Sequence, residues 1–238
     1  MPLKPSPLRI TGESPMLWKD EGLLHLGAEA EVRSGIWLGI SAVKKKRLPR
    51  TWRHPDLDRT LTRRRLDAEC RAMRRLSACD IRIPALLQLD RATHTMVMSR
   101  LPGSPLIELL REGVDDASAM LSKVGGMIRQ MHRQGVVHGD LSTNNILWSE
   151  DEPALVDLGL SRLTTEIEHF GIDLHVLQEI LSGSHPEYAD AMSAVESGYL
   201  AFDETAGPTP DSSGGALPSA EQVIKRLEDI RSRVRYHG

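Results

Sequence analysis

Residues 138–159 limit the possible folds of this chain more than any other segment. They place three oxygen-bearing side chains at a defined spacing around a short apolar run. Asn145 follows Asp140 by five residues, and a second apolar run leads to Asp157 in an Asp-Leu-Gly triplet. Carboxylate and amide oxygens are the ligands that Mg²⁺ prefers, and turns of this length can gather them in one cleft. A lone Asp-x-Gly is more often a turn, but the ordered set predicts a phosphate-handling site.

The order of these residues is the phosphoryl-transfer signature of the protein-kinase fold. In that fold Asp140 would accept a hydrogen bond from the attacking hydroxyl or water, so we assign it as catalytic. Asn145 and Asp157 would hold the Mg²⁺ ions that bridge the ATP phosphates. The predicted ligands are therefore ATP and Mg²⁺.

Hydrophobic periodicity places the elements in the order that such a fold requires. Glycine-punctuated runs predict strands over residues 18–43, a long helix over 56–77, and further strands over 83–89 and 95–98. After a proline-containing connector at 101–105, helical spacing predicts helices at 120–131, 171–181 and 219–235. We expect an α+β, bilobal protein-kinase-like fold. Its small β-rich N-lobe with one long helix covers residues 18–101, and its reduced helical C-lobe covers 102–238.

The chain ends and one internal segment are expected to be loosely held. Residues 1–17 contain four prolines and no secretory signal, so they predict a flexible tail. Residues 206–220 are rich in Gly, Pro and Ser, which predicts a mobile loop. No apolar run approaches the roughly 20 residues of a membrane helix. Cys70 and Cys79 are expected to be reduced thiols of a free-standing cytoplasmic protein, which would also be nuclear in a eukaryote.

The fold also requires a strand lysine that holds the ATP phosphates and a helix glutamate that orients it. Three successive lysines follow Val43, and the residues alone do not select one of them. Glu69 and Asp67 are both available as the helix acid. The loop over 27–32 has one glycine and two acids, so by itself it gives no support for nucleotide binding.

Positive charge is concentrated in one part of an otherwise slightly acidic chain. Residues 44–75 contain 13 Lys or Arg and 4 Asp or Glu, whereas the net charge of the chain is −3. Such a block is most often a solvated helix face. A surface for nucleic-acid phosphates is the alternative.

Several segments together resemble the small atypical kinase/ATPase subunit of the KEOPS (EKC) complex, also called the PRPK family. The similarity runs from about residue 20 to the C-terminus, residues 206–220 excepted. The matching segments are 27–30 (Gly-Ala-Glu-Ala), 45–49, 52–55, 57–58, 63–65, 69–71, 138–143, 157–161, 173–177 and 184–186.

The resemblance implies roles for residues that the pattern alone leaves open. It selects Lys45 as the phosphate-contacting catalytic lysine and Glu69 as its partner. It places Glu29, together with Gly27 and Ala28, in the loop that covers the nucleotide. Met98 falls at the gatekeeper position, and the hinge that binds adenine runs from Ser99 to Leu101. The chain departs from the family pattern at Ser99 (usually an acid), Leu158 (usually Phe) and Leu66 (usually Thr).

Three absences bear on the reaction. Gly139 stands where regulated kinases carry an arginine, Ser142 stands where a lysine usually follows the catalytic Asp, and only 13 residues separate Gly159 from Asp173. They favour ATP hydrolysis or autophosphorylation over efficient Ser/Thr phosphorylation of many proteins. The resemblance implies work within KEOPS, beside the metal-dependent subunit that forms threonylcarbamoyladenosine on tRNA. The helix over 53–75 and the tail over 231–235 would then contact tRNA.

Two other interpretations remain. A nucleotide-binding scaffold would assemble the complex and dock tRNA without turnover, although the complete set of site residues argues against an inactive site. A RIO-type or aminoglycoside-phosphotransferase-like kinase also uses His-Gly-Asp-Leu. The basic segment after Lys45 and the short chain after Asp157 disfavour both of these.

Overall fold

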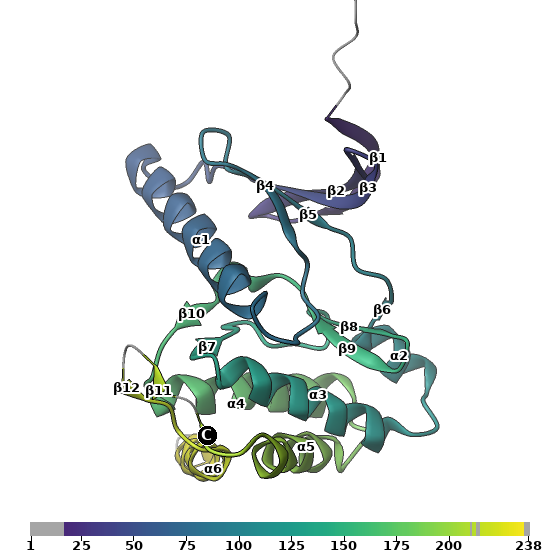
Figure 1. Cartoon of the computed structure of the whole chain (residues 1–238), viewed down its shortest axis with the longest axis vertical. Coiled ribbons are helices and arrows are strands. Elements are labelled where there is room, and N and C mark those ends of the chain that lie inside the picture. The colour runs from purple at the N-terminus through teal and green to yellow at the C-terminus, as the bar shows by residue number, and fades with distance from the viewer. Residues whose placement is uncertain (1–16, 210, 213–214, 236–238) are drawn as a thin grey trace, which may run out of the picture.

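The computed structural model describes residues 17–209, 211–212 and 215–235. The tail predicted over residues 1–17 lies outside them, except for Leu17. A twisted sheet with one long helix beside it stands above a layer of helices, and the two parts are joined by the chain around residues 100–103 (Figure 1). Within the described residues, no helix is long and apolar enough to cross a membrane.

The upper part is an antiparallel sheet with the strand order β1-β2-β3-β5-β4. Its strands are β1 (Trp18–Leu26), β2 (Ala30–Trp37), β3 (Ile40–Arg47), β4 (Leu86–Asp90) and β5 (Thr95–Ser99). β3 is the central strand, and successive side chains of a strand point to opposite faces. Lys45 and Arg47 are therefore buried on the same face of the sheet.

Helix α1 (Pro55–Leu76) confirms the long helix predicted over 56–77. Pro55 occupies the first turn, where its missing N–H costs no hydrogen bond, and the His54 side chain accepts from the backbone N–H of Asp56. Acidic residues lie in the first turn and basic residues in the last, as the helix dipole favours. The helix buries Glu69 together with Leu66, Cys70, Met73 and Leu76.

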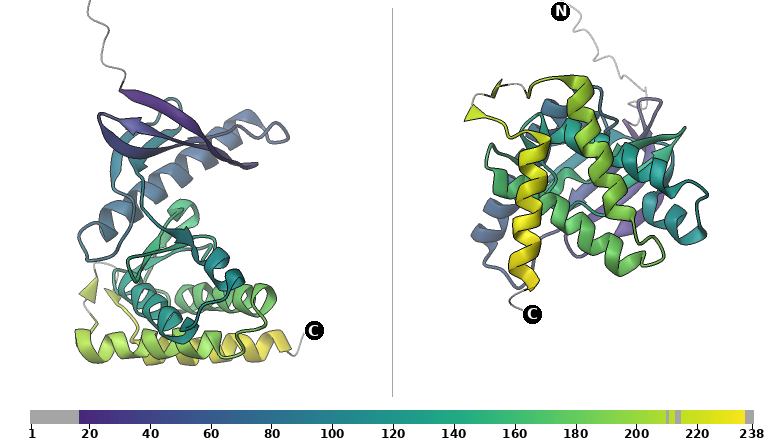
Figure 2. Two further views of the ribbon diagram at one scale, coloured as in Figure 1. Left: turned by 90° about the vertical axis from the view of Figure 1, so that its right-hand side faces the viewer. Right: turned by 90° about the horizontal axis from the view of Figure 1, so that it is seen from below.

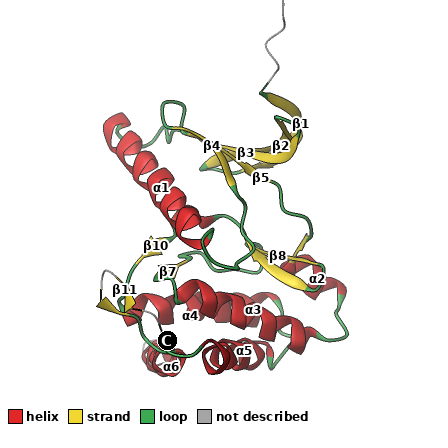
Figure 3. Ribbon diagram, viewed as in Figure 1, coloured by secondary structure: helices red, strands yellow, loops and turns green. Residues whose placement is uncertain are grey.

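The lower part is mainly helical, with small two- and three-stranded sheets beside its helices (Figure 3). Its helices are α2 (Leu106–Glu112), α3 (Ala117–His132), α4 (Ile167–Ser184), α5 (Ala191–Ala206) and α6 (Ala220–Arg235), with a short 3₁₀ turn, η1 (Leu158–Leu160). Its strands are β6 (Ser104–Pro105), β7 (Val136–Val137), β8 (Ile146–Ser149), β9 (Glu152–Leu155), β10 (Arg162–Leu163), β11 (Asp211–Ser212) and β12 (Gly215–Ala216). The apolar stripe predicted on α3 is buried throughout.

Helix α5 is absent from the sequence-based prediction. It lies beside α6 across the base of the molecule (Figure 2) and packs closely against α3. A Cβ atom on Gly125 of α3 would lie 1.9 Å from the carbonyl oxygen of Val195, and one on Gly198 of α5 would lie 1.8 Å from that of Ser122. The two helices therefore approach backbone to backbone, which only glycine permits at these two positions.

The segment over 206–220 is tied down at both ends. Arg129 donates to Thr209 and to the carbonyl oxygen of Pro218, and Arg133 donates to the carbonyl oxygens of Gly207 and Pro208. Ser219 then begins α6 with a reciprocal capping pair to Gln222. The mobility predicted for the part between these anchors stays a prediction.

A buried hydrogen-bonded chain connects α5 to the turn that carries Asp140. Asp173 of α4 accepts the backbone N–H groups of His138 (2.6 Å) and Gly139 (2.8 Å), and its Oδ2 lies 3.2 Å from Nε2 of His132. The other ring nitrogen of His132 lies 2.9 Å from the Tyr199 hydroxyl. Burial lowers the pKa of His132 and outweighs the opposing effect of Asp173. We therefore infer a neutral ring that accepts from Tyr199 and donates to Asp173.

The close approach of α3 and α5 predicts a specific loss of stability. Gly198→Ala should lower the free energy of unfolding by about 1–3 kcal/mol, because the new methyl group forces the helix backbones apart. Gly183→Ala in α4 is the control, since nothing lies within 4 Å of its added Cβ, and it should be neutral or stabilise by up to about 1 kcal/mol. Urea unfolding measures both. Equal effects of the two substitutions would contradict the close contact.

The neutral, buried His132 predicts a pH dependence of stability. Its folded-state pKa lies below the unfolded value of 6.5, as does that of His185. The unfolded chain therefore binds more protons, so stability is full above about pH 6.5 and falls as the pH drops below it. The slope should be about 1.4 kcal/mol per pH unit for each proton.

Urea unfolding between about pH 7.5 and pH 5.5 tests this dependence. His132→Asn should flatten the dependence by its share, whereas His94→Asn, in the turn between β4 and β5, should leave it unchanged. A wild-type profile that is flat over this interval would show that the folded and unfolded states bind the same number of protons, which would contradict the lowered pKa of His132.

Candidate functional site

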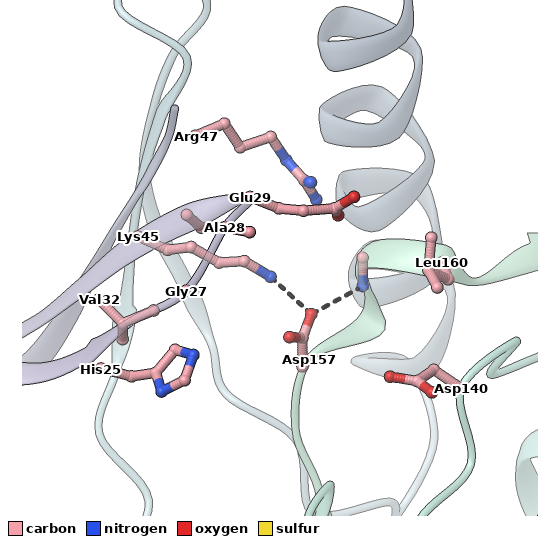
Figure 4. Close-up of a pocket in the computed structure, with 12 residues that line it drawn as sticks. His25, Gly27, Ala28, Glu29, Val32, Lys45, Arg47, Asp140, Asp157 and Leu160 are labelled. Atoms are coloured by element: carbon pink, nitrogen blue, oxygen red, sulfur yellow. Dashed lines mark hydrogen bonds and ion pairs between the residues drawn. The ribbon is translucent and has the colours of Figure 1, made fainter. Parts of the chain in front are cut away.

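A cavity of about 240 Å³ lies between the two parts of the molecule (Figure 4). It brings together six of the predicted site residues, from the loop between β1 and β2, from β3, from the 138–145 turn and from the Asp-Leu-Gly segment. Its lining residues are His25, Gly27, Ala28, Glu29, Ala30, Val32, Lys45, Arg47, Asp140, Asp157, Gly159 and Leu160.

Lys45 is the strand lysine, as the resemblance implies. Its ammonium lies 2.8 Å from Oε1 of Glu69 and 2.6 Å from Oδ1 of Asp157. Strand alternation removes the neighbouring lysines from the site, because Lys44 stacks on the ring of Trp18 and Lys46 is exposed. The competing helix acid, Asp67, pairs with Arg91 at the surface, which leaves Glu69 as the buried partner.

The charges around Lys45 stabilise one another. Burial opposes the charged form of Lys45, but the negative charges of Glu69 and Asp157 outweigh it and raise the pKa. Burial likewise opposes ionisation of Asp157, but the Lys45 ammonium outweighs it and lowers the pKa. Lys45 and Asp157 are therefore both charged near neutral pH, and the Lys45 cation lines the cavity.

Arg47 is a site residue that the sequence-based prediction missed. It is buried, it lines the cavity, and its guanidinium lies 2.6 Å from Oε2 of Glu69. One carboxylate thus accepts from two cations. The signal was available, because a residue two positions after Lys45 on a strand must share its face.

The backbone of Asp157 adopts the left-handed conformation, with φ of 55°. This conformation is uncommon for a residue with a side chain and is typical of functional sites. Oδ1 accepts from Lys45 and from the backbone N–H of Gly159 at 3.2 Å. These contacts fix the carboxylate at the mouth of the cavity (Figure 4), and within the described chain Oδ2 has no hydrogen-bond partner. Oδ2 is thus available to a metal ion.

Asp140 and Asn145 are held together in the turn below the cavity. The Asn145 amide nitrogen donates to the backbone oxygen of Asp140 at 2.9 Å and to its carboxylate at 3.2 Å. The amide oxygen of Asn145 is left available. Together with Asp157 it offers the hard oxygen donors that suit Mg²⁺. The described residues contain no group of three or more His, Cys, Asp or Glu suited to a metal ion. Oxygen atoms of phosphate and of water would therefore have to complete the coordination shell of a bound Mg²⁺.

Glu29 is turned away from the expected phosphate position. Its carboxylate pairs with Arg50 at 2.5 Å and with Arg65 of α1 at 2.6 Å (Figure 4 shows it pointing toward α1). The hydrogen bond from Arg65, reinforced by the charges of both arginines, lowers the Glu29 pKa. The Glu29 carboxylate, in the loop between β1 and β2, is thus compensated by two guanidinium groups, and the one from Arg65 fastens the loop to α1.

The predicted adenine hinge lies at the end of β5. Met98 is buried, and neither Met98, Ser99 nor Leu101 lines the 240 Å³ cavity. The N–H of Ser99 donates to the carbonyl of Ala85, and that of Arg100 donates to the carbonyl of Ser41. Leu101 is therefore the hinge residue whose N–H is left for a ligand in the described structure. The adenine contacts stay a prediction.

One departure from regulated kinases, Gly139, and two departures from the family pattern, Leu158 and Leu66, have structural explanations. Gly139 has φ of 79°, and a Cβ there would lie 2.3 Å from the carbonyl oxygen of Leu160, so an arginine does not fit. Leu158 is buried and keeps the apolar plug that was expected of it. Leu66 of α1 is also buried and packs in the hydrophobic core. An apolar side chain therefore occupies the position where the family usually has the hydroxyl of a threonine.

Comparisons with known proteins agree with this geometry. The RIO domain family model matches residues 42–169, more than half of the chain. Two Rio2 kinase structures from Chaetomium thermophilum have the same fold, each with a TM-score of 0.58 at 17% and 19% identity. The first, a complex with ADP, Mg²⁺ and phosphoaspartate, aligns over 91% of this chain and 72% of its own. The predicted bilobal protein-kinase-like fold is confirmed.

Three relatives cover about nine-tenths of this chain. One is the "EKC/KEOPS complex subunit Tp53rkb" of Mus musculus, 31% identical, with 86% of its length covered. Another is the "Probable serine/threonine-protein kinase BUD32 homolog" of Archaeoglobus fulgidus, 31% identical, with 95% covered. A "Probable bifunctional tRNA threonylcarbamoyladenosine biosynthesis protein" of Methanothermobacter thermautotrophicus is 33% identical, but the chain spans only 36% of its length.

One expectation is wrong. The basic segment after Lys45 and the short chain after Asp157 were expected to separate this chain from RIO-type kinases, yet the RIO domain model matches residues 42–169, which include the basic segment and the first twelve residues after Asp157. The KEOPS resemblance and the RIO relationship are therefore compatible. The chain belongs to the RIO-domain family, in the branch of atypical kinases that includes the EKC/KEOPS complex subunits.

Proposed function

We propose that the chain is a Mg-ATP-dependent phosphotransferase or ATPase that supports threonylcarbamoyladenosine modification of tRNA within a KEOPS complex. The observation that carries the proposal is the Lys45 ammonium held between Glu69 and Asp157, directly above the Asp140–Asn145 turn. The names of the relatives support the setting, since they refer to KEOPS subunits and to biosynthesis of this tRNA modification.

The residues divide the work of phosphoryl transfer. Lys45 binds the ATP phosphates, and the backbone of the hinge at Leu101 binds adenine. Asn145 and Asp157 would hold Mg²⁺, which would supply positive charge next to the transferred phosphoryl group. Asp140 accepts a hydrogen bond from the attacking hydroxyl or water and orients it. The Rio2 kinase complex with ADP and Mg²⁺ supports the choice of nucleotide and metal.

Hydrolysis or autophosphorylation is favoured over phosphorylation of many proteins. Ser142, at the usual lysine position, is buried and supplies no positive charge near the transferred group. Between Gly159 and Asp173 the chain passes from η1 through the two-residue β10 directly into α4, which leaves little backbone for docking a peptide. The metal-dependent tRNA-modifying subunit is the proposed partner.

The proposed tRNA contact falls on α1 more than on the C-terminal tail. Arg231 pairs with Gln178 and Glu196, and Arg233 lies 3.8 Å from Glu168, so both have partners in α4 and α5. The side chain of Arg235 lies outside the described part of the chain. Arg64 and Arg71, which are exposed on α1, are the stronger candidates.

The proposal predicts the effect of removing each oxygen ligand. Asp157→Ala should abolish Mg-dependent ATP turnover, because both the metal contact and the Lys45 partner are lost. Asp140→Asn should lower turnover by about 10²–10⁴-fold, because the attacking group is no longer oriented by a carboxylate. Asp115→Ala and Asp115→Asn make the same changes at an exposed position and should retain activity. Phosphate release is measured for the chain alone and with the partner subunit and tRNA.

The same assay separates the enzyme from the scaffold. Turnover that increases with the partners and disappears in Asp157→Ala would support an enzyme controlled by its complex. ATP binding without turnover under any condition, with tRNA modification retained in Asp140→Asn, would sink the enzymatic proposal and leave the scaffold.

A further inference from the structure

A second cavity, of about 610 Å³, lies beside the first and shares Gly159 and Leu160 with it. It runs between α1 and the segment that follows Asp157. We call it the arginine cleft. Four of its nine lining residues are arginines and none is acidic: Arg64, Arg65, Ala68, Arg71, Gly159, Leu160, Ser161, Arg162 and Leu163.

The positive charge of the arginine cleft is largely uncompensated. Arg64 and Arg71 are exposed and, within the described chain, form no ion pair or hydrogen bond. Arg162 donates to the ring of His169 at 2.6 Å rather than to a carboxylate. Only Arg65 has an acidic partner, and that partner is Glu29 of the nucleotide-covering loop. The four arginines that line the arginine cleft thus have one carboxylate partner among them, Glu29.

We propose that the arginine cleft binds the phosphate backbone of an RNA strand, in contact with the ATP cavity. The inference rests on the proposed function, which supplies tRNA as the RNA. Guanidinium groups bind phosphates in bidentate geometry. Arg64 and Arg71 lie seven residues apart on α1, about 10.5 Å along the helix axis, so they can contact separate phosphates of one strand. The exposed Leu160 (47%) and Leu163 (43%) offer apolar contacts to ribose or bases at the rim.

Arg65 links this cleft to the nucleotide. Arg65 lines the cleft, and its guanidinium is bound to Glu29, which lines the ATP cavity. An RNA phosphate in the cleft competes with Glu29 for Arg65, so RNA binding loosens the loop that covers the nucleotide. By thermodynamic reciprocity, removing the negative charge of Glu29 strengthens RNA binding.

The test measures binding of a fluorescein-labelled tRNA transcript by anisotropy over a range of salt concentrations. Arg64→Ala/Arg71→Ala should weaken binding at least tenfold and should reduce the slope of log affinity against log salt by roughly 1.4–1.8, the value for two lost phosphate contacts. Arg63→Ala/Arg74→Ala is the matched control. It removes the same charge from exposed positions of the same helix outside the cleft, and it should weaken binding less than threefold. Glu29→Gln should tighten binding severalfold.

Three results would overturn the inference. Equal losses in the two double variants would show a diffuse basic surface instead of a cleft. Unchanged RNA affinity in Glu29→Gln would remove the link through Arg65. Poly-glutamate bound in place of tRNA, with the same dependence on Arg64 and Arg71, would assign the cleft to an acidic protein segment.

ATP turnover without RNA, measured on the same samples, keeps this inference separate from the proposed function. Turnover that depends on Asp157 while tRNA fails to bind would reject the cleft alone. Cleft-dependent tRNA binding without any turnover would reject the enzymatic proposal alone.

Discussion

The site depends on the buried ammonium of Lys45, which holds three distant parts of the chain at one point. From the central strand of the sheet, Lys45 pairs with Glu69 of α1 and with Asp157, which lies 112 residues later in the chain. A buried charge is costly unless it is paired and hydrogen-bonded, and removal of one partner leaves the other uncompensated. The relative position of the sheet, α1 and the lower part of the molecule is therefore coupled to the chemistry of the site.

A second set of charges extends along the same face of α1. Glu69 accepts from Lys45 and Arg47, while Glu29 accepts from Arg50 and Arg65. In ordinary kinases glycines allow the covering loop to approach the phosphates. Here the ion pair of Glu29 with Arg65 fastens the loop to the helix. Arg65 lines the arginine cleft and Glu29 lines the first cavity, so this ion pair connects the two cavities.

Buried polar groups in the core of the lower part hold the turn that carries Asp140 in position. Asp203 pairs with Arg129 and Arg133, Arg129 also reaches the Tyr199 hydroxyl, and the chain of contacts continues through His132 to Asp173. Asp173 in turn binds the backbone on either side of the 138–139 peptide. Buried polar groups of this kind must be satisfied, and a satisfied network specifies one packing of the core. The turn that carries Asp140 is thus positioned by helices that do not touch the cavity.

The sequence by itself determined the elements with strong periodicity and the residues with a fixed local spacing. Helices α1, α3 and α6, the five strands of the upper sheet, and the roles expected of Asp140, Asn145 and Asp157 follow from such local patterns. The choice of Lys45 and Glu69 required the family resemblance. Strand alternation leaves the buried face undecided until the sheet is packed against a helix.

Only the tertiary structure decided the features that depend on residues far apart in the chain. Helix α5 has a weak periodic signal and is specified by the contact of Gly198 with α3. The place of Arg47 beside Glu69, the pairing of Glu29 with Arg65, and the meeting of Arg162 with the arginines of α1 all join separate elements. Local sequence fixes backbone preference and side-chain spacing, but long-range charge pairing exists only once the core has brought the elements together.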